Sequence, residues 1–426
     1  DWSSDVCSSD LVYIVKKEED IMKKFNKFLS VAVASAMVMA MAGCGNTDNG
    51  SAATGTNAAT ESAAASDSAA SGSVFKIGGI GPTTGGAAVY GLAVQHGAEI
   101  AVEEINAAGG INGYQVEFKF QDDEADAEKS VNAYNALKDW GAQIIDGSTT
   151  SGACIAVTDK TKEDNMFQIT PSGSAVECVQ YDNNFRVCFS NPNQGLASAQ
   201  YIGENGLAEK IAVIYDSSDV YSSGIYEKFA KEAENQPFEI VAAEAFTADN
   251  KTDFSVQLQK AKDAGADMVF LPIYYQESAL ILTQAAAMGY APKWFSCDGM
   301  DGILGGVDNF DVSLTEGVML LTPFAADATD DLTQSFVTKY KEKYGETPNQ
   351  FAADSYDAIY VIKAAIEKSG VTPDMSVSDI CDGMKAAMTE ITVDGLTGNG
   401  MTWTADGEAN KAPKAVVIEN GAYKAM

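Results

Sequence analysis

The sequence predicts an α/β fold built from two doubly wound lobes with parallel sheets. Buried-strand runs alternate with helical segments from residue 74 onward, a pattern typical of parallel sheets covered by helices on both faces. The alternation breaks at 185–195, where Pro192 and Gly195 stand among polar residues, and then starts again. Two successive series of this kind predict two similar lobes.

The first series opens with two strands and two helices. We expect a strand at 74–80, a helix from about residue 89 to the glycine pair at 109–110, a strand at 116–120, and a helix with 131, 134 and 138 on one stripe. A loop beginning at Asp122-Asp123 separates the second strand from the second helix.

The next stretch, 144–175, is a strand–loop–helix–strand–loop unit. Its apolar runs end at Asp146-Gly147 and at Thr170-Pro171, and its helix begins near Gly152. Both loops follow the carboxyl ends of strands, which border the ligand-binding crevice of an open parallel sheet. The loops carry six hydroxyl side chains: Ser148, Thr149, Thr150, Ser151, Ser172 and Ser174. Hydroxyls beside a helix start suit a carboxylate, although Ser and Thr are also ordinary loop residues.

The second series follows the break. Its expected strands are 210–215, 239–243, 268–271, 293–297 and 318–321, and its expected helices start near 221, span 254–261 and run up to 289. The rest of the chain adds helices around 336–344, at 351–368 and near 377–388, with short strands near 396–403 and 414–418. No series long enough for a third domain remains, so we expect these pieces to pack onto the two lobes.

The composition excludes several classes of function. The 426 residues carry 28 Lys+Arg against 60 Asp+Glu, for a net charge of −32, which argues against nucleic acid or anionic lipid as a partner. The one histidine, His96, sits at helical spacing, so we expect it on a helix surface or half-buried. A multi-His metal centre is excluded, a Ser–His nucleophile is improbable, and we expect no metal and no cofactor.

The N-terminal part predicts export and membrane attachment. Residues 1–21 match no element and are interpreted as a non-native remnant, whereas 22–43 has the basic start and short apolar run of a signal peptide. Its end, Met-Ala-Gly followed by Cys44, resembles a bacterial lipobox with Met in place of the usual Leu; a plain secretory signal is the alternative. Small and polar residues fill the rest of 44–73, which predicts a flexible tether behind a lipidated Cys44.

From residue 75 to the C-terminus the chain resembles a known family. The matching segments are 76–81, Tyr90-Gly91, Asn106-Ala107-Ala108-Gly109-Gly110-Ile111-Asn112-Gly113, Asp122-Asp123, Ile169-Thr170-Pro171, Gln194-Gly195 and Asp298-Gly299. They are similar to the branched-chain amino-acid (Leu/Ile/Val-type) substrate-binding proteins of ABC transporters. The resemblance implies a type I periplasmic binding fold, with two lobes joined by three crossovers and closing on a ligand. Lobe one would be 74–191 plus 324–411, and lobe two 192–323 plus 412–426.

The same resemblance implies seven ligand-binding residues. They are Tyr90, Ser151, Ser172, Ser174, Tyr221, Tyr274 and Asp298. Ser151 matches the serine that meets the ligand carboxylate, and Ser172 and Ser174 match positions that add backbone and hydroxyl contacts. Asp298 stands where an acid, often Glu, pairs with the ligand ammonium. The tyrosines would shield both charges from water, which matters because an unpaired buried charge is costly.

Each assignment has an alternative. The tyrosines match interior residues with a satisfied hydroxyl equally well, and Tyr275 could take the place of Tyr274. Asp298 could be a simple turn former before Gly299, in which case Asp301 competes for its role. Apart from Cys44, the exported part has an odd number of cysteines, so at least one is unpaired, and Cys178 and Cys188 are close enough in sequence to bridge a loop. Cys154 and Cys297 lie near predicted site segments, and we assign them no role beyond lining.

The preferred interpretation is an extracytoplasmic, lipid-anchored, monomeric receptor that delivers an amino acid to an ABC permease. A sensor ectodomain of the same fold is less favoured, because no apolar run of about 20 residues follows Pro323. A receptor for a non-amino-acid solute stays open. Ser151 lacks a usable His or Lys base beside it, so we expect no enzyme activity.

Overall fold

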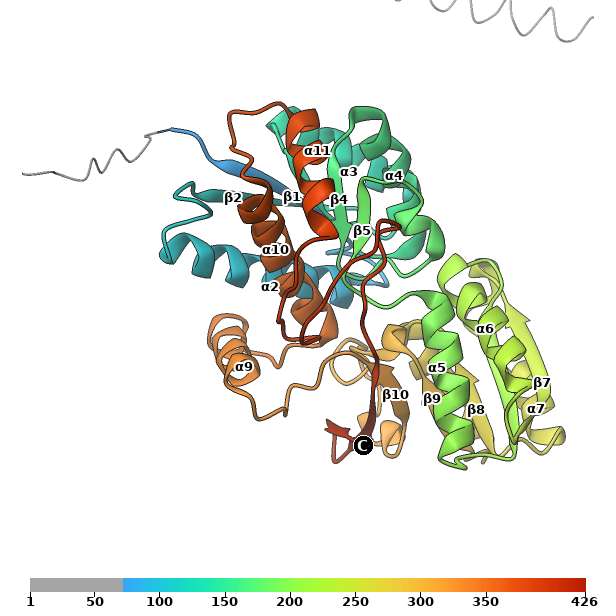
Figure 1. The fold of residues 1–426 in the computed structure, drawn as a ribbon. Coiled ribbons are helices and arrows are strands. Elements are labelled where there is room, and N and C mark those ends of the chain that lie inside the picture. Colours follow the sequence, from blue (N-terminus) through green and yellow to red (C-terminus); the bar gives the residue numbers. More distant parts are fainter. Residues whose placement is uncertain (1–71) are drawn as a thin grey trace, which may run out of the picture. The chain divides into compact units, whose positions relative to one another are not determined.

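Figure 1 shows the computed structural model, which describes residues 72–426. The expected remnant, the signal peptide, Cys44 and nearly all of the tether lie outside the described residues. Within 72–426, no helix combines the length and the apolar character needed to cross a membrane.

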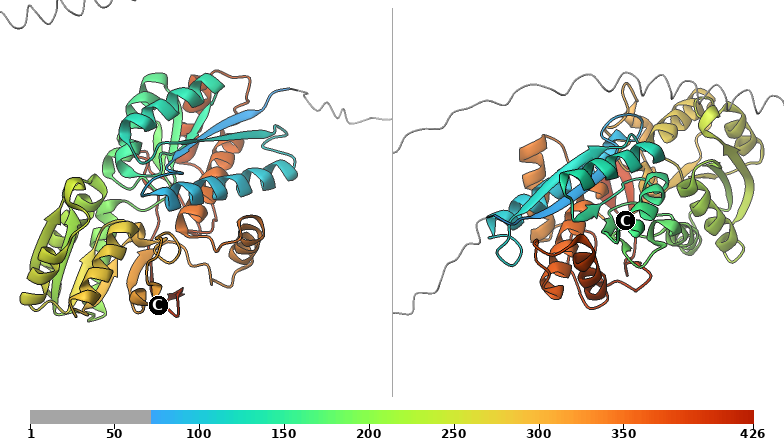
Figure 2. Two further views of the ribbon diagram at one scale, coloured as in Figure 1. Left: turned by 180° about the vertical axis from the view of Figure 1, so that it is seen from behind. Right: turned by 90° about the horizontal axis from the view of Figure 1, so that it is seen from above.

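The first sheet consists of five parallel strands in the order β2-β1-β3-β4-β5. They are β1 (Phe75–Gly81), β2 (Val116–Asp122), β3 (Ile144–Asp146), β4 (Phe167–Thr170) and β5 (Asn184–Arg186). One face is covered by α2 (Ala88–Ala107), α10 (Gln350–Ser369) and α11 (Val377–Met388). The other carries α3 (Ala127–Trp140) and α4 (Ser151–Asp164), which lie in front of the strands when seen from behind (Figure 2).

The second sheet has seven strands in the order β12-β11-β10-β9-β8-β6-β7. Its parallel part is β6 (Lys210–Asp216), β7 (Glu239–Phe246), β8 (Met268–Leu271), β9 (Lys293–Ser296) and β10 (Met319–Thr322). The last two strands, β11 (Lys414–Glu419) and β12 (Ala422–Ala425), are antiparallel. Its helices are α5 (Asn191–Glu204) and α6 (Val220–Ala233), which pack together, and α7 (Ser255–Asp263) and α8 (Tyr275–Ala287). The remaining helix, α9 (Asp331–Tyr344), packs against α2.

The predicted fold class is confirmed, with three additions. The sequence analysis included neither the short strand β5, which falls at the break between the two series, nor α5, which begins with Asn191-Pro192 after an extended Ser190. It also missed the hairpin of β11 and β12, whose turn residues Asn420 and Gly421 have φ values of 53° and 71°. Positive φ at both turn positions is the requirement of a type I′ hairpin, which Asn-Gly satisfies best.

The strand expected near 396–403 is wrong. This segment forms only isolated bridges, Val393 with Met401 and Trp403 with Ala409. The backbone N–H groups of Leu396 and Thr397 instead donate to the Asp357 carboxylate at 2.8 and 2.9 Å. The buried Asp357 carboxylate therefore binds two backbone N–H groups that a strand would donate to a neighbouring strand.

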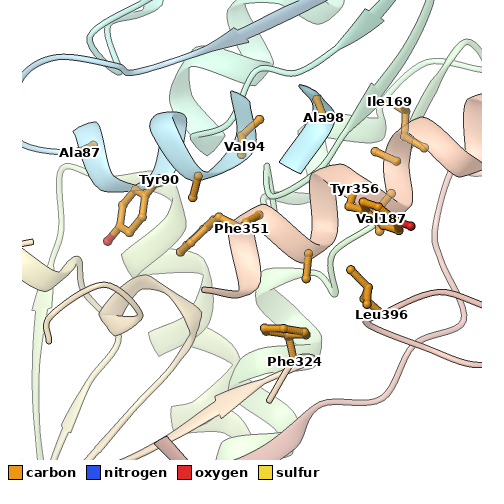
Figure 3. Close-up of a cluster of buried hydrophobic side chains, with 14 of the residues drawn as sticks. Ala87, Tyr90, Val94, Ala98, Ile169, Val187, Phe324, Phe351, Tyr356 and Leu396 are labelled. Atoms are coloured by element: carbon orange, nitrogen blue, oxygen red, sulfur yellow. The ribbon is translucent and has the colours of Figure 1, made fainter. Parts of the chain in front are cut away.

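The largest buried cluster brings α2 and α10 together. Figure 3 shows Tyr90 on α2 beside Phe351 on α10, and their ring centroids are 4.4 Å apart. His96 on α2 is half-buried, as expected, and stacks on Tyr344 of α9 with 3.7 Å between ring centroids. This packing fixes the first turn of α2, which carries Tyr90, against the elements around it.

Candidate functional site

All seven predicted site residues lie at or just beyond the carboxyl ends of parallel strands, or in the first turn of the following helix. Four of them lie at helix starts: Ser151 is the first residue of α4, Tyr90 and Tyr221 lie in the first turns of α2 and α6, and Tyr274 is the N-cap of α8. Ser172 and Ser174 follow β4. Asp298 begins the short 3-10 helix Asp298–Met300 after β9.

Contacts at Asn191 join the ends of the two sheets. The N–H of Asn191 donates to the Ser174 carbonyl at 2.8 Å, and its side-chain amide donates to the Val220 carbonyl at 3.1 Å. The loop after β4 and the start of α6 are thus tied to one residue. This places the serines of the first sheet near the start of α6, which also contacts α4.

The first-sheet end of the site is suited to an anion. The capping residue of α4, Thr150, makes no side-chain cap, so the first N–H groups of the helix are left without that partner. The hydroxyls of Thr150 and Ser174 are buried and have no hydrogen-bond partner within residues 72–426. Ser151 Oγ accepts the N–H groups of Ser174 and Ala175, both at 3.2 Å, which leaves its own proton free to donate. An uncapped helix start with free hydroxyls attracts a carboxylate.

Ser172 is used differently from its neighbours. Its hydroxyl donates to the Thr149 carbonyl at 2.6 Å, so its proton is already committed. It offers a ligand an acceptor only, unlike Ser151 and Ser174.

The second-sheet end is suited to a cation. The carboxylate of Asp298 is 4% exposed and accepts the Tyr221 hydroxyl at 2.6 Å and the Gln194 amide at 2.8 Å. Both donors are neutral, and this carboxylate forms no ion pair within the described part of the chain. Burial, together with the nearby charge of Asp354, raises the pKa of Asp298 to about 7 against the lowering effect of these hydrogen bonds. A buried carboxylate without a cation is poised to accept one.

The glycine after Asp298 is required by this arrangement. A Cβ at Gly299 would lie 2.6 Å from the Tyr221 hydroxyl, which accepts the Gly299 N–H at 2.8 Å. Only glycine therefore lets Tyr221 reach Asp298 at this turn.

Aromatic rings surround the acidic end. Tyr221 stacks on Tyr274 with ring centroids 5.0 Å apart, and Tyr90 meets Tyr274 edge-on at 5.4 Å. The Tyr90 hydroxyl donates to the Gly299 carbonyl and accepts the N–H of Tyr275 at 3.2 Å. Tyr90 thus offers a ring rather than a free hydroxyl.

The alternatives for two residues are spatially separate. Tyr275 is buried against Tyr90, whereas Tyr274 is partly exposed and stacks on Tyr221. Asp301 accepts the N–H of Gln350 at 2.9 Å and does not contact Tyr221. Geometry therefore favours Tyr274 and Asp298, rather than Tyr275 and Asp301, at the acidic end that is suited to a cation.

Three further residues belong to this site and were not predicted. Gln194 holds Asp298; Phe351 packs on Tyr90; and Asp219 accepts the Tyr221 N–H at 3.0 Å and hydrogen-bonds the Tyr274 hydroxyl. The Gln194-Gly195 pair was part of the resemblance, but no spacing rule connects Gln194 to a carboxylate 104 residues away.

The cysteines of residues 72–426 are free thiols. Cys154, Cys178, Cys188, Cys297 and Cys381 are all buried, and the bridge between Cys178 and Cys188 that the sequence allows is not formed. Cys178 lies behind the serine end, 3.7 Å from the Ser151 carbonyl oxygen.

Comparison with known proteins places this site in context. The protein family described as periplasmic binding protein matches residues 74–422 of this chain. A Leu/Ile/Val-binding protein homologue of Brucella melitensis is 30% identical over 300 residues, which cover 70% of this chain and 80% of the relative. A leucine-, isoleucine-, valine-, threonine- and alanine-binding protein of Pseudomonas aeruginosa is 30% identical over 69% of this chain and 78% of its own length.

Solved structures have the same fold. A branched-chain amino-acid transporter substrate-binding protein of Streptococcus pneumoniae in complex with isoleucine superposes with a TM-score of 0.75 at 29% identity, covering 83% of this chain and 98% of that one. A leucine-binding protein of Thermotoga maritima gives 0.73 at 27%, with the same coverage. A solute-binding protein of R. palustris in complex with benzoate gives 0.73 at 20%, covering 83% and 95%, and this likeness concerns the fold alone.

Proposed function

Since the chain belongs to the periplasmic binding protein family, in its group of Leu/Ile/Val-type substrate-binding proteins of ABC transporters, we propose that it captures a branched-chain amino acid. We propose further that it delivers this amino acid to an ABC permease. The relatives are binding proteins, so we propose no catalytic step. Family membership supports an extracytoplasmic location for residues 74–422.

One observation carries the choice of an amino acid. A buried carboxylate with only neutral partners, Asp298, lies at a strand end of the second sheet, and the uncapped start of α4 lies at a strand end of the first sheet. Asn191 connects the two ends through its contacts with Ser174 and Val220. A zwitterion brings a cation for the first and an anion for the second, and it neutralises both without a counter-ion from solvent. A simple carboxylic acid would leave Asp298 unpaired.

The proposed contacts follow from this polarity. Ser151 and Ser174 donate to the ligand carboxylate, and Asp298 accepts from the ligand ammonium. Ser172 Oγ, whose proton is committed to the Thr149 carbonyl, can only accept and so does not bind the carboxylate. Tyr90, Tyr221 and Tyr274 form the walls that keep water from both charges. Phe351 and the aromatic rings offer apolar surface to an aliphatic side chain.

We further propose that the two lobes are 74–191 plus 324–411 and 192–323 plus 412–426. The separation of the strands into two sheets supports these limits, because β1 to β5 fall in the first and β6 to β12 in the second. The three crossovers would then lie near 190–192, 323 and 411–413 and serve as the hinge.

The function is tested by ligand binding. Leucine, isoleucine or valine should raise the melting temperature by several degrees at concentrations well above Kd, because ligand binds only the folded state. Calorimetry with 4-methylpentanoate, which lacks the ammonium of leucine, should show much weaker binding. If benzoate or 4-methylpentanoate bound as tightly as any amino acid, the protein would be a receptor for another solute.

Binding should weaken in acid. The ligand ammonium requires an ionised Asp298, and burial holds the pKa of this carboxyl at about 7 in the free protein. Below that pH a proton must leave before the cation binds, so affinity should fall by up to about tenfold per pH unit, and it should level off above pH 7. Calorimetry between pH 5 and 8 measures this, and affinity that rose on acidification would contradict it.

We also propose that Cys44 is the lipid attachment point. The signal-like segment before it and the tether after it motivate this assignment. In a bacterial host, Cys44→Ser should shift the protein from the membrane fraction to the soluble or unprocessed pool. Cys381→Ser, a distant buried thiol, is the matched control and should leave fractionation unchanged. Membrane association that survived Cys44→Ser would refute the anchor.

A further inference from the structure

Arg186 is the only arginine in the chain, and all other residues among the 28 Lys+Arg are lysines. It ends β5, and its side chain is completely buried and is one of the largest in the interior of residues 72–426. Burying a guanidinium is costly unless the surroundings match its donors and its charge. Its contacts therefore indicate what the single arginine is used for.

The guanidinium faces the loop that carries Ser174. Its Nη1 donates to the Gly173 carbonyl at 3.2 Å, and its Nη2 donates to the Ala175 carbonyl at 2.8 Å. These two carbonyls belong to the residues on either side of Ser174, so one planar side chain holds the backbone before and after it. The ammonium of a lysine is a single point charge and does not reproduce this fork.

The contact with Arg186 fixes the direction of the Gly173–Ser174 peptide, which is trans. In a trans peptide the carbonyl and the N–H point in opposite directions. The Gly173 carbonyl points to Arg186, and the Ser174 N–H donates to Ser151 Oγ at 3.2 Å. Arg186 thus keeps the negative end of this peptide away from Ser151, where the ligand carboxylate is proposed to bind.

The positive charge of Arg186 is only partly neutralised. Its Nε lies 3.4 Å from Glu408 Oε2 but has no hydrogen-bond partner within residues 72–426, and the Glu408 side chain is 34% exposed. The charge also reaches Cys154 in the first turn of α4. Burial raises the pKa of this thiol, but hydrogen bonds with Cys178 and Thr170 and the charge of Arg186 lower it overall. Arg186 therefore favours an anion at the start of α4.

The backbone of Arg186 is fixed by the C-terminal segment 403–408. Its N–H donates to the Gly407 carbonyl at 3.0 Å, and its carbonyl accepts the Trp403 indole N–H at 2.8 Å. Arg186 therefore connects the loop 173–175 to a segment more than 200 residues further along the chain.

We propose that Arg186 is a positioning residue for the ligand carboxylate, which orients the loop that carries Ser174 and adds a positive charge behind it without contacting the ligand. This inference rests on the proposed amino-acid function. It adds the cation that balances the ligand carboxylate, because none of the seven predicted ligand contacts has a positive charge.

The first test compares leucine with leucinamide, which keeps the ammonium and the side chain of leucine but not its carboxylate. Calorimetry on the full chain should show that wild type prefers leucine. Arg186→Lys keeps the charge but loses the fork, so this preference should fall by about tenfold. The double variant Arg186→Met with Glu408→Gln also removes the charge and leaves no unpaired Glu408, so the preference should fall by on the order of a hundredfold.

Lys160→Met is the matched control, because it removes a positive charge from α4 itself. Lys160 pairs with Glu163 at the surface, with side chains 43% and 70% exposed, so the preference for leucine should not change. Thermal unfolding checks that each variant is folded. An equal loss of affinity for leucine and leucinamide in the Arg186 variants would mean that Arg186 only supports the fold, and it would overturn the proposal.

A second test requires no variant, because a single arginine gives a single side-chain Nε–H signal in the NMR spectrum of protein made with isotope-labelled arginine. Saturating leucine should shift this signal, and saturating leucinamide should shift it much less. A signal that bound leucine leaves unchanged would overturn the role of Arg186 and leave the proposed function intact. Wild type that binds no amino acid would overturn both.

Discussion

Asp298→Asn is expected to weaken amino-acid binding by about 3–5 kcal/mol, which is roughly two to three orders of magnitude or more in Kd. The substitution keeps the shape of the side chain and a hydrogen-bonding group, but it removes the only charge proposed to meet the ligand ammonium. The cation would still lose its water in a site where Tyr221 and Gln194 are the neighbours, and both are neutral. Calorimetry with leucine, isoleucine and valine measures the loss.

Ser151→Ala is the matched comparison at the opposite end of the ligand. It removes one hydroxyl among several donors, including the backbone N–H groups of α4, so a loss of roughly 1–2 kcal/mol is expected. Deaminated analogues should bind wild type poorly, and Asp298→Asn should narrow the gap between analogue and amino acid. Equal small losses at both positions would mean that no zwitterion is held in this way.

The elements with strong periodicity could be read from the sequence. The structure places α11 at Val377–Met388 and β8 at Met268–Leu271, the limits expected from their apolar patterns. Both are bounded by clear signals, such as the capping Ser376, whose hydroxyl accepts the Asp379 N–H at 3.1 Å. The local sequence pattern was sufficient to predict these two elements, because burial of one helix face or of a whole strand determines which positions are apolar.

Other elements were missed although their signals were present. Asn191-Pro192 reads as a loop, yet proline at the start of a helix is favoured, and α5 begins there. Asn420-Gly421, between β11 and β12, is a dipeptide typical of a two-residue hairpin turn. The failed strand near 396–403 is different, since its outcome depends on Asp357, a residue on another element.

The residues of the candidate site also fall into those that local sequence signals predict and those that depend on the packing of distant elements. Asp298 and the serines could be placed by motif, because they follow strand ends in a recognisable order. Gln194 could not, because its contact with Asp298 depends on how α5 packs beside β9. Asp301 was considered only as a rival of Asp298, and its contact with the Gln350 N–H depends on how the start of α10 packs beside the loop after β9.

The interior also contains one ion pair whose loss should be severe. Lys411, in the proposed third crossover, is fully buried and lies 2.8 Å from Asp354, which is 2% exposed. Its ammonium also donates to Thr397, which in turn donates to Asp357 at 2.5 Å. One cation therefore faces two buried carboxylates.

Lys411→Met should cost about 3–5 kcal/mol of unfolding free energy, because it leaves both carboxylates buried without a cation. Chemical denaturation measures the loss, and Lys368→Met is the control. Lys368 pairs with Glu390 at the surface, with side chains 46% and 62% exposed, so we expect about 0–1 kcal/mol there. Adding Asp354→Asn to Lys411→Met should recover part of the loss, since one unpaired charge is then removed.

The pH dependence of this variant provides the sharper test. Burial raises the pKa of Asp354 to about 6 even with Lys411 present, and removal of the lysine must raise it further. An acid with a raised folded-state pKa destabilises the protein above its unfolded-state pKa, and this cost grows with pH until the folded-state pKa is reached and is constant above it. The costs in wild type and in the variant therefore separate only above the wild-type value of about 6. The deficit of Lys411→Met should therefore be large at pH 8 and shrink toward pH 5. A deficit that stayed constant over this range would mean that the lysine contributes packing rather than charge.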